Sequence, residues 1–282
     1  GAPSGPPPGL GSGPVAHTDR ASKSGLSRYI PAYMNPKYRL ATFKGSRVGR
    51  DDPNSPYMQF MKKSVRLGFI RKVFGVLAVQ LLVTFSIVSL FVFSDDVKAF
   101  VQDTPGVFYA AWITTLVMMI GLVCFDDVRR EYPKNYIFLA LFTLSESYLL
   151  GAISSFYDTP TIMMIIIFTM TISLSVTAYA CQTTYDFTKW GGMLFCGVIL
   201  LILIGFAAAV IPDRGAQIAY AAFGTALFAA FMCYDVQLVV GGRHTKYSIG
   251  PDEYIFAALN IYLDVVNMFV LMLILIGGKA AQ

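Results

Sequence analysis

Seven apolar stretches follow one another from residue 73 onward, and they limit the folds open to this chain. A helix needs about 20 apolar residues to cross the hydrocarbon core of a bilayer. The stretches are residues 73–93, 107–125, 136–156, 161–181, 191–211, 216–240 and 254–276. The connections are short, and prolines stand at several predicted boundaries, where a missing amide is tolerated. We predict an all-α membrane protein, a single bundle of seven transmembrane helices within residues 61–278.

The composition agrees with this fold class and leaves no large soluble domain. Hydrophobic residues make up 55% of the chain and charged residues 14%, with a mean hydropathy of +0.58. The net charge of +5 does not indicate nucleic acid, because 13 of the 22 Lys and Arg residues precede Val73. The four cysteines, Cys124, Cys181, Cys196 and Cys233, lie in or at the ends of apolar spans, which favours packing over disulfides.

The two ends of the chain differ from the bundle. Residues 1–60 are rich in Gly, Pro and Ser and hold no apolar run, so we predict a disordered tail, neither a signal peptide nor a span. Its GPPPG stretch is suited to polyproline II and could dock a reader of Pro-rich motifs; the alternative is a simple linker. Residues 279–282 are predicted to be a short carboxyl-terminal tail.

The distribution of basic residues predicts the orientation. The amino-terminal tail and alternate loops hold 19 Lys and Arg residues, and the opposite side holds three. The amino terminus is therefore expected in the cytosol. Seven spans place the carboxyl terminus on the other side, and a re-entrant last segment would reverse that.

The last span has a helix-start signal. Gly250 is the expected N-cap, Pro251 the first helical residue, and Asp252 and Glu253 the acids that complement the helix dipole.

Two aspartates within the last two spans, Asp235 and Asp264, are the main candidates for function. An ionisable side chain at the centre of a membrane helix costs roughly 2.5–3.5 kcal/mol, so such residues usually line a water path, bind an ion or find a partner. The short connection predicts antiparallel neighbours whose two acids face each other. Asn260 and Asn267 share the face of Asp264 at helical spacing and could hydrate an ion.

Two ionised carboxylates about 4 Å apart repel by roughly 4 kcal/mol at an effective dielectric of 20. We therefore expect the pair formed by Asp235 and Asp264 to share a proton or to bind a cation, which makes it sensitive to pH. Two carboxylates with amides and water suit weak, transient binding of calcium as a permeant ion, with no resident cofactor. The alternative is a protonated pair that only joins two helices.

Three further charged residues could tune this pair. Arg129 and Arg130 follow the second span on the side of Asp235, and either side chain could reach a carboxylate; otherwise both are ordinary cytosolic basic residues. Glu146 lies near the middle of the third span. It either extends the path or is a neutral acid hydrogen-bonded to a neighbouring helix, and the sequence does not decide between these.

The fourth span carries hydroxyls at helical spacing, Thr169, Ser173 and Thr177. Such a stripe more often bonds its own backbone or a neighbouring helix than lines a pore, so we expect packing.

Residues 71–278 resemble the lifeguard branch of the transmembrane Bax-inhibitor-motif family. The motifs that carry the resemblance are RKVFG at 71–75, QTTYDFT at 182–188, YDVQL at 234–238 and PDEYIFAALNIYLD at 251–264. The resemblance implies a seven-helix bundle of the Bax-inhibitor type, a calcium leak across endoplasmic reticulum or Golgi membranes, and suppression of cell death. Plasma or endolysosomal membranes are alternative locations.

The same resemblance implies particular site residues and partners. The positions of Asp235 and Asp264 match a di-aspartyl pH sensor, and a basic residue at the position of Arg129 or Arg130 helps to hold the closed state. The implied partners are the bilayer, calcium ions, and cell-death regulators or membrane receptors.

Rival functions are weighed against the same residues. An intramembrane aspartyl protease carries Gly-x-Gly before its second acid, whereas bulky residues precede Asp264 here, and a seven-span zinc hydrolase would need histidines in the membrane, whereas His17 and His244 lie outside the spans. A non-conducting adaptor for membrane partners stays open. We therefore predict a channel and not an enzyme.

Overall fold

The computed structural model describes residue 1 and residues 63–210, 213–241 and 247–277. Apart from residue 1, the predicted tails at 1–60 and 279–282 lie outside the described residues, and so does the GPPPG stretch proposed to dock a reader of Pro-rich motifs. In chain order the elements are α3 (Lys63–Phe93), α4 (Asp95–Asp103), α5 (Pro105–Cys124), α6 (Asp126–Arg130), α7 (Lys134–Ser154), α8 (Thr159–Gln182), the 3₁₀ helix η3 (Phe187–Lys189), α9 (Gly191–Val210), α10 (Arg214–Val240) and α11 (Tyr254–Ile276).

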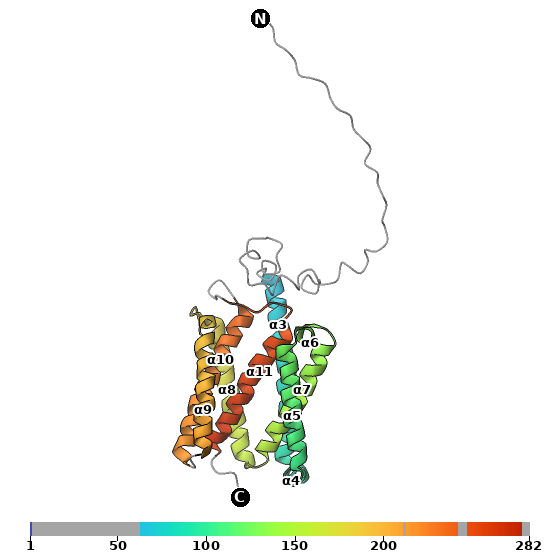
Figure 1. Cartoon of the computed structure of the whole chain (residues 1–282), viewed down its shortest axis with the longest axis vertical. Helices are drawn as coiled ribbons and strands as arrows, with labels where there is room; N and C mark the ends of the chain where they lie inside the picture. The colour runs from blue at the N-terminus through green and yellow to red at the C-terminus, as the bar shows by residue number, and fades with distance from the viewer. Residues whose placement is uncertain (2–62, 211–212, 242–246, 278–282) are drawn as a thin grey trace, which may run out of the picture.

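Seven of the described helices are long and apolar enough to cross a membrane: α3, α5, α7, α8, α9, α10 and α11. They correspond one to one with the predicted spans, which confirms the all-α, seven-helix fold class. The first span begins earlier than predicted because its helix continues back through a basic turn to Lys63. α4 and α6 are short helices that lie between spans (Figure 1).

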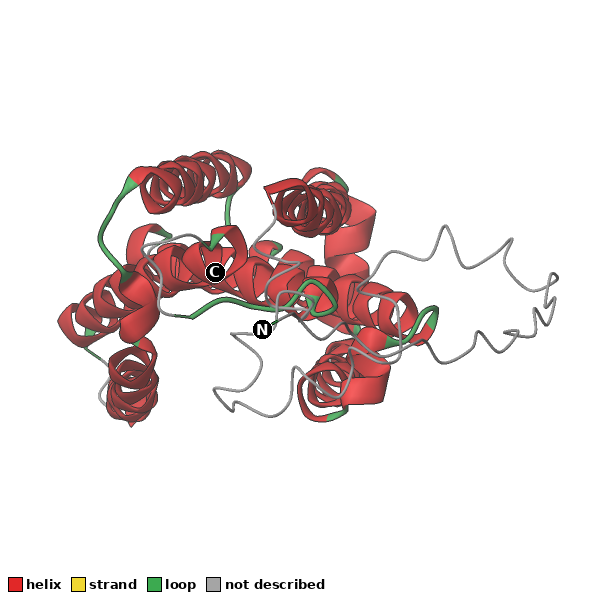
Figure 2. Ribbon diagram, turned by 90° about the horizontal axis from the view of Figure 1, so that it is seen from above, coloured by secondary structure: helices red, strands yellow, loops and turns green. Residues whose placement is uncertain are grey.

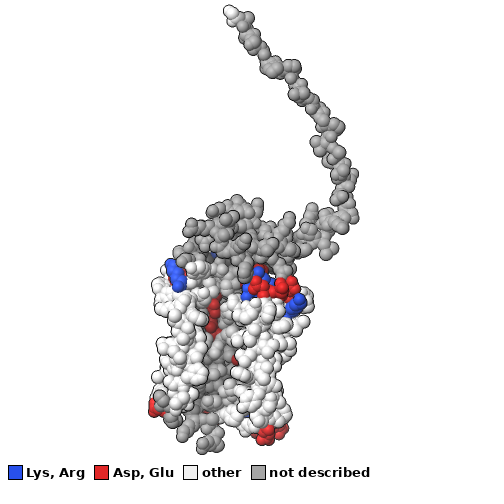
Figure 3. Space-filling model, viewed as in Figure 1, with Lys and Arg blue, Asp and Glu red and all other residues white. Residues whose placement is uncertain are grey.

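The bundle has two ends, named here after the short helix at each (Figure 1). At the α6 end, α7, α9 and α11 begin and α5, α8 and α10 finish; at the α4 end these relations are reversed. Figure 3 shows basic and acidic side chains gathered at the rims and an almost uncharged belt between them. Such a belt is the surface that a bilayer requires.

α11 is the central helix of the bundle. It packs on α10, α3 and α8 and also contacts α7, and in Figures 1 and 2 it crosses the middle obliquely while other helices surround it. Its side chains at Ile255, Leu259, Tyr262 and Met268 are fully buried. An apolar helix that is covered on all sides belongs to the core and not to the lipid surface.

Prolines mark several helix starts as predicted, but the start of α11 differs from the prediction. Pro105 opens α5 and Pro160 lies in the first turn of α8. In α11 the N-cap is Glu253 and the first helical residue is Tyr254, while the amide of Glu253 bonds to the Gly250 carbonyl in a preceding turn. The expected cap at Gly250 and first position at Pro251 were therefore wrong, because these residues form that turn instead.

The four cysteines lie within the described residues and are free thiols, three of them exposed and Cys233 buried. The predicted packing role therefore fits Cys233, whereas the other three cysteines lie on the surface of the bundle.

Candidate functional site

The structure brings Asp235 and Asp264 together at the contact between α10 and α11. Their side chains are 6% and 4% exposed, and the two carboxyl groups share a hydrogen bond. Such a bond needs a proton on one of the two acids. The second carboxyl oxygen of Asp264, Oδ2, has no hydrogen-bond partner among the described residues. The pair, called the dyad below, therefore keeps a buried acceptor unused.

The two predicted amides lie beside the dyad in different ways. Asn267 is half-buried, and its Nδ2 donates to the Leu263 carbonyl of its own helix at 2.7 Å. Asn260 is also half-buried. Both remain on the helix that carries Asp264, as their spacing predicts.

Gln237 fixes α10 close to the dyad. Its side chain accepts from the Phe187 amide at 2.8 Å and donates to the Tyr185 carbonyl at 2.8 Å and to the Ala180 carbonyl at 3.5 Å. Three bonds from one buried amide tie the end of α8 and the turn before α9 to α10. The motifs at 182–188 and 234–238, which are far apart in the sequence, thus meet in space two residues from Asp235.

A second buried polar group, which sequence reasoning missed, lies on another side of α11. The Thr84 hydroxyl is 2.9 Å from that of Ser147 and 2.8 Å from that of Tyr262, and Gln80 Nε2 donates to the Thr143 hydroxyl at 3.0 Å. We call these five residues the hydroxyl cluster. The sequence signal for this cluster was polar residues spaced by four within two apolar spans, at 80 and 84 and at 143 and 147. The cluster joins α3, α7 and α11.

Tyr262 and Asp264 are two residues apart, which places their side chains on nearly opposite faces of a helix with 3.6 residues per turn. Glu146 belongs on the Tyr262 side: it is half-buried and interacts electrostatically with that tyrosine. The structure therefore does not bring Glu146 to the dyad. Figure 3 shows a few acidic atoms within the otherwise uncharged belt.

Arg129 and Arg130 have partners other than the predicted ones. Arg129 Nε lies 2.8 Å from Glu253 Oε2 and Arg129 Nη2 lies 2.6 Å from Asp126 Oδ1. Arg130 bonds to Glu253 through Nε at 2.8 Å and also through Nη2, and its Nε lies 3.6 Å from Asp252 Oδ2. We call these five residues the ion cluster.

In this structure Arg129 and Arg130 pair with Glu253 in the ion cluster, and their pairing with the dyad in a closed state stays a prediction. α6 holds both guanidinium groups at the rim, against the start of α11, whereas Asp235 lies more than a helical turn inside α10. Pairing an arginine with an acid at the rim costs less desolvation than pairing it with the buried dyad. Burial alone would lower the pKa of Arg130, but the hydrogen bond and charge of Glu253 outweigh it and raise that pKa. Arg130 therefore stays charged, and the cluster joins α6 to α11.

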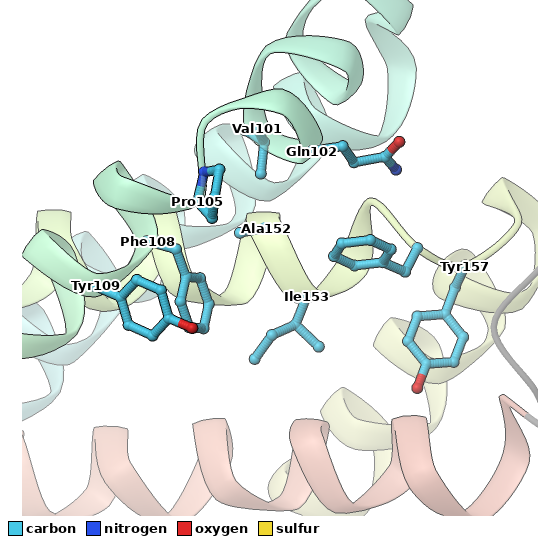
Figure 4. A pocket seen from close by; sticks show the side chains of 9 residues that line it. Val101, Gln102, Pro105, Phe108, Tyr109, Ala152, Ile153 and Tyr157 are labelled. Carbon is cyan, nitrogen blue, oxygen red and sulfur yellow. The ribbon is translucent and has the colours of Figure 1, made fainter.

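Metal sites and pockets give no second candidate in the described part of the chain. Groups of three or more His, Cys, Asp or Glu side chains that could hold a metal are not found there. A pocket of about 440 Å³ lies at the α4 end (Figure 4), between α4, α5 and α7, and neither aspartate of the dyad lines it. Its lining is mostly apolar and aromatic, as at Val101, Phe108 and Ile153, and carries no charged side chain.

The comparisons with known proteins agree with the fold and the motifs. The sequence family described as Inhibitor of apoptosis-promoting Bax1 matches residues 66–281. The chain belongs to this Bax-inhibitor family. It is 38% identical over 222 residues to Protein lifeguard 3 of Homo sapiens, covering 77% of this chain and 70% of that protein, and 36% identical to the Mus musculus protein over the same length. It is also 31% identical over 205 residues to the Golgi anti-apoptotic protein of Vaccinia virus (strain Lister), covering 73% of this chain and 83% of the viral one. These relatives place the chain on the lifeguard side of the Bax-inhibitor family.

Proposed function

We propose that this Bax-inhibitor family member is a pH-sensitive calcium leak channel of intracellular membranes, gated by Asp235 and Asp264. The observation that carries the proposal is a hydrogen-bonded pair of acids, each at most 6% exposed, in the core of a seven-helix membrane bundle. Two charges there repel by roughly 4 kcal/mol at 4 Å and a dielectric of 20, so loss of the shared proton demands a cation in its place. A calcium ion with its water can take that position.

The charge of the dyad depends on the protons and cations that it binds and on the titratable groups around it. On α10 the titratable side chain that interacts with Asp235 is that of Tyr234. The ammonium group of Lys72 on α3 lies 3.4 Å from the centre of the Tyr254 ring, at the start of α11. The ion cluster holds the α6 end of α11 while the dyad is protonated. We infer that protonation keeps the path closed and that deprotonation opens it.

The cellular role follows from a leak of this kind. A leak in the endoplasmic reticulum or Golgi lowers the calcium available for release, and the viral relative is named an anti-apoptotic protein of the Golgi. We extend that role to this chain, with its amino terminus in the cytosol as the basic residues predict.

The test is calcium flux against pH in vesicles that contain the purified full chain. Wild-type flux should rise as pH increases, and Asp235→Asn and Asp264→Asn should each remove that dependence. Asp95→Asn, which changes an acid that is 98% exposed at the α4 end, is the matched control and should behave as the wild type. Unchanged pH dependence in both dyad variants would refute the sensor. Tight wild-type vesicles that pass no calcium at any pH would favour the non-conducting adaptor instead.

A further inference from the structure

The buried face of α8 carries hydroxyl groups without partners. Thr169 is 3% and Ser173 is 7% exposed, and neither side-chain oxygen has a hydrogen-bond partner among the described residues. A buried hydroxyl without a hydrogen bond destabilises the folded state, and serine or threonine in a membrane helix normally bonds its own backbone. Thr171, on the same helix, does so with the Ile167 carbonyl at 2.7 Å. The packing role expected for the stripe does not explain Thr169 and Ser173.

These hydroxyls face the helices that carry the dyad. α8 packs mainly on α10 and α11, and its opposite face is exposed, as at Ile167 (58%), Met170 (56%) and Leu174 (66%). The residues buried on α8 recur at helical spacing and include Thr169 and Ser173. Their side chains are therefore directed into the bundle.

The depth of each hydroxyl can be set against Asp235. The bond from Gln237 to the Ala180 carbonyl places these two residues at one level. With a rise of about 1.5 Å per residue, Asp235 lies about 3 Å below that level toward the α4 end, and Thr177 about 4–5 Å below it. Ser173 then lies about 10 Å and Thr169 about 16 Å below the same level. The stripe therefore starts near the depth of Asp235 and continues toward the α4 end.

A third unpartnered oxygen belongs to the dyad itself, Oδ2 of Asp264. Unpartnered buried oxygens on α8 and α11 need a polar species between the helices, and water or a hydrated ion is what such atoms bind. We infer that Thr169 and Ser173 form the third wall of a hydrated cation path that runs from the dyad toward the α4 end. The hydroxyls supply neutral oxygens for a divalent cation that the acids attract. This inference deepens the proposed function and depends on it for the identity of the ion.

The first experiment measures calcium flux for Thr169→Val with Ser173→Ala in vesicles. These changes keep the volume nearly constant and remove two oxygens, so flux should fall about tenfold while its dependence on pH stays that of the wild type. Thr171→Val removes a hydroxyl that already has a backbone partner and should leave flux unchanged. Wild-type flux in the double variant would overturn the inference.

The second experiment tests hydration without relying on flux. In a background whose four native cysteines are replaced by alanine, Ser173→Cys and Thr169→Cys should react with a small water-soluble methanethiosulfonate reagent. The lipid-facing Leu174→Cys is the control and should react at least tenfold more slowly, because thiolates form in water and not in lipid. Equal labelling at all three positions would overturn the inference. If wild-type vesicles pass no calcium at any pH, the leak is refuted, and this labelling still decides whether the α8 face contacts water.

Discussion

The ion cluster gives the sharpest energetic prediction, because its geometry allows the size of the effect to be worked out. Glu253 is 2.8 Å from Arg129 Nε and 2.8 Å from Arg130 Nε, and these three side chains are 10–15% exposed. At that distance and an effective dielectric of 20, the Coulomb attraction of each pair is about 6 kcal/mol. Desolvation of the partners cancels most of it, which leaves a net coupling of about 2 kcal/mol between Arg130 and Glu253.

A double-mutant cycle measures this coupling. Arg130→Gln, Glu253→Gln and the double variant are compared with the wild type by reversible unfolding in detergent micelles. Glu253→Gln alone should cost about 3–5 kcal/mol, since it leaves two largely buried guanidinium groups without their shared acid. The double variant should cost about 2 kcal/mol less than the sum of the single changes.

The same loop offers a matched control for the cycle. Lys134 and Glu131 are 3.3 Å apart with side chains 60% and 37% exposed, and an exposed pair of this kind contributes less than about 1 kcal/mol. The cycle on Glu131→Gln and Lys134→Gln should therefore give the smaller coupling. If the coupling between positions 130 and 253 does not exceed that of the control, the ion cluster does not hold α6 to α11.

Three further predictions concern the packing and the ends of the helices. Tyr262→Phe removes the hydroxyl that joins α11 to the hydroxyl cluster and should lower the free energy of unfolding by about 1–3 kcal/mol; no change would show that the cluster contributes no stability. Gly151→Ala should lower the free energy of unfolding by about 1–3 kcal/mol, because a Cβ there would lie 2.8 Å from the Phe91 ring. In the control Gly75→Ala the new Cβ meets nothing within 4 Å, so the free energy of unfolding should rise by about 0.5–1 kcal/mol. Equal effects of the two changes would contradict the close contact of α3 and α7. Hydrogen bonds from the backbone amide and then the hydroxyl of Thr161 hold the pKa of Asp158 below its ordinary value. The stabilisation from ionised Asp158 is therefore fully present above the ordinary pKa and is lost as pH falls through the lowered pKa. The unfolding temperature of the wild type should therefore decline relative to Asp158→Asn between about pH 5 and pH 2, and parallel curves would contradict this cap.

The spans could be predicted from the sequence because the bilayer sets their length directly. Every predicted span corresponds to a helix, and residues 254–276 match α11 at both ends. The encounter of Asp235 and Asp264 also follows from the sequence, since a short connection forces α10 and α11 to be antiparallel neighbours.

Contacts between distant helices could not be predicted in this way. The bond between Thr84 and Tyr262 joins residues 178 positions apart, and nothing in either span specifies the rotation that brings the two hydroxyls together. Glu253 was expected to complement the helix dipole of α11. Instead, Arg129 and Arg130 take its carboxylate, since charge-assisted pairing is stronger than the interaction with a helix dipole.

α11 is held by polar contacts on three sides: the dyad on α10, the hydroxyl cluster on α3 and α7, and the ion cluster on α6. All three sets of contacts are made by one rigid helix. A rotation of α11 about its long axis would therefore strain all three at once. Protonation of the dyad would therefore change the stability of the ion cluster at the rim. A change in the ion cluster would in turn alter the proton affinity of the dyad.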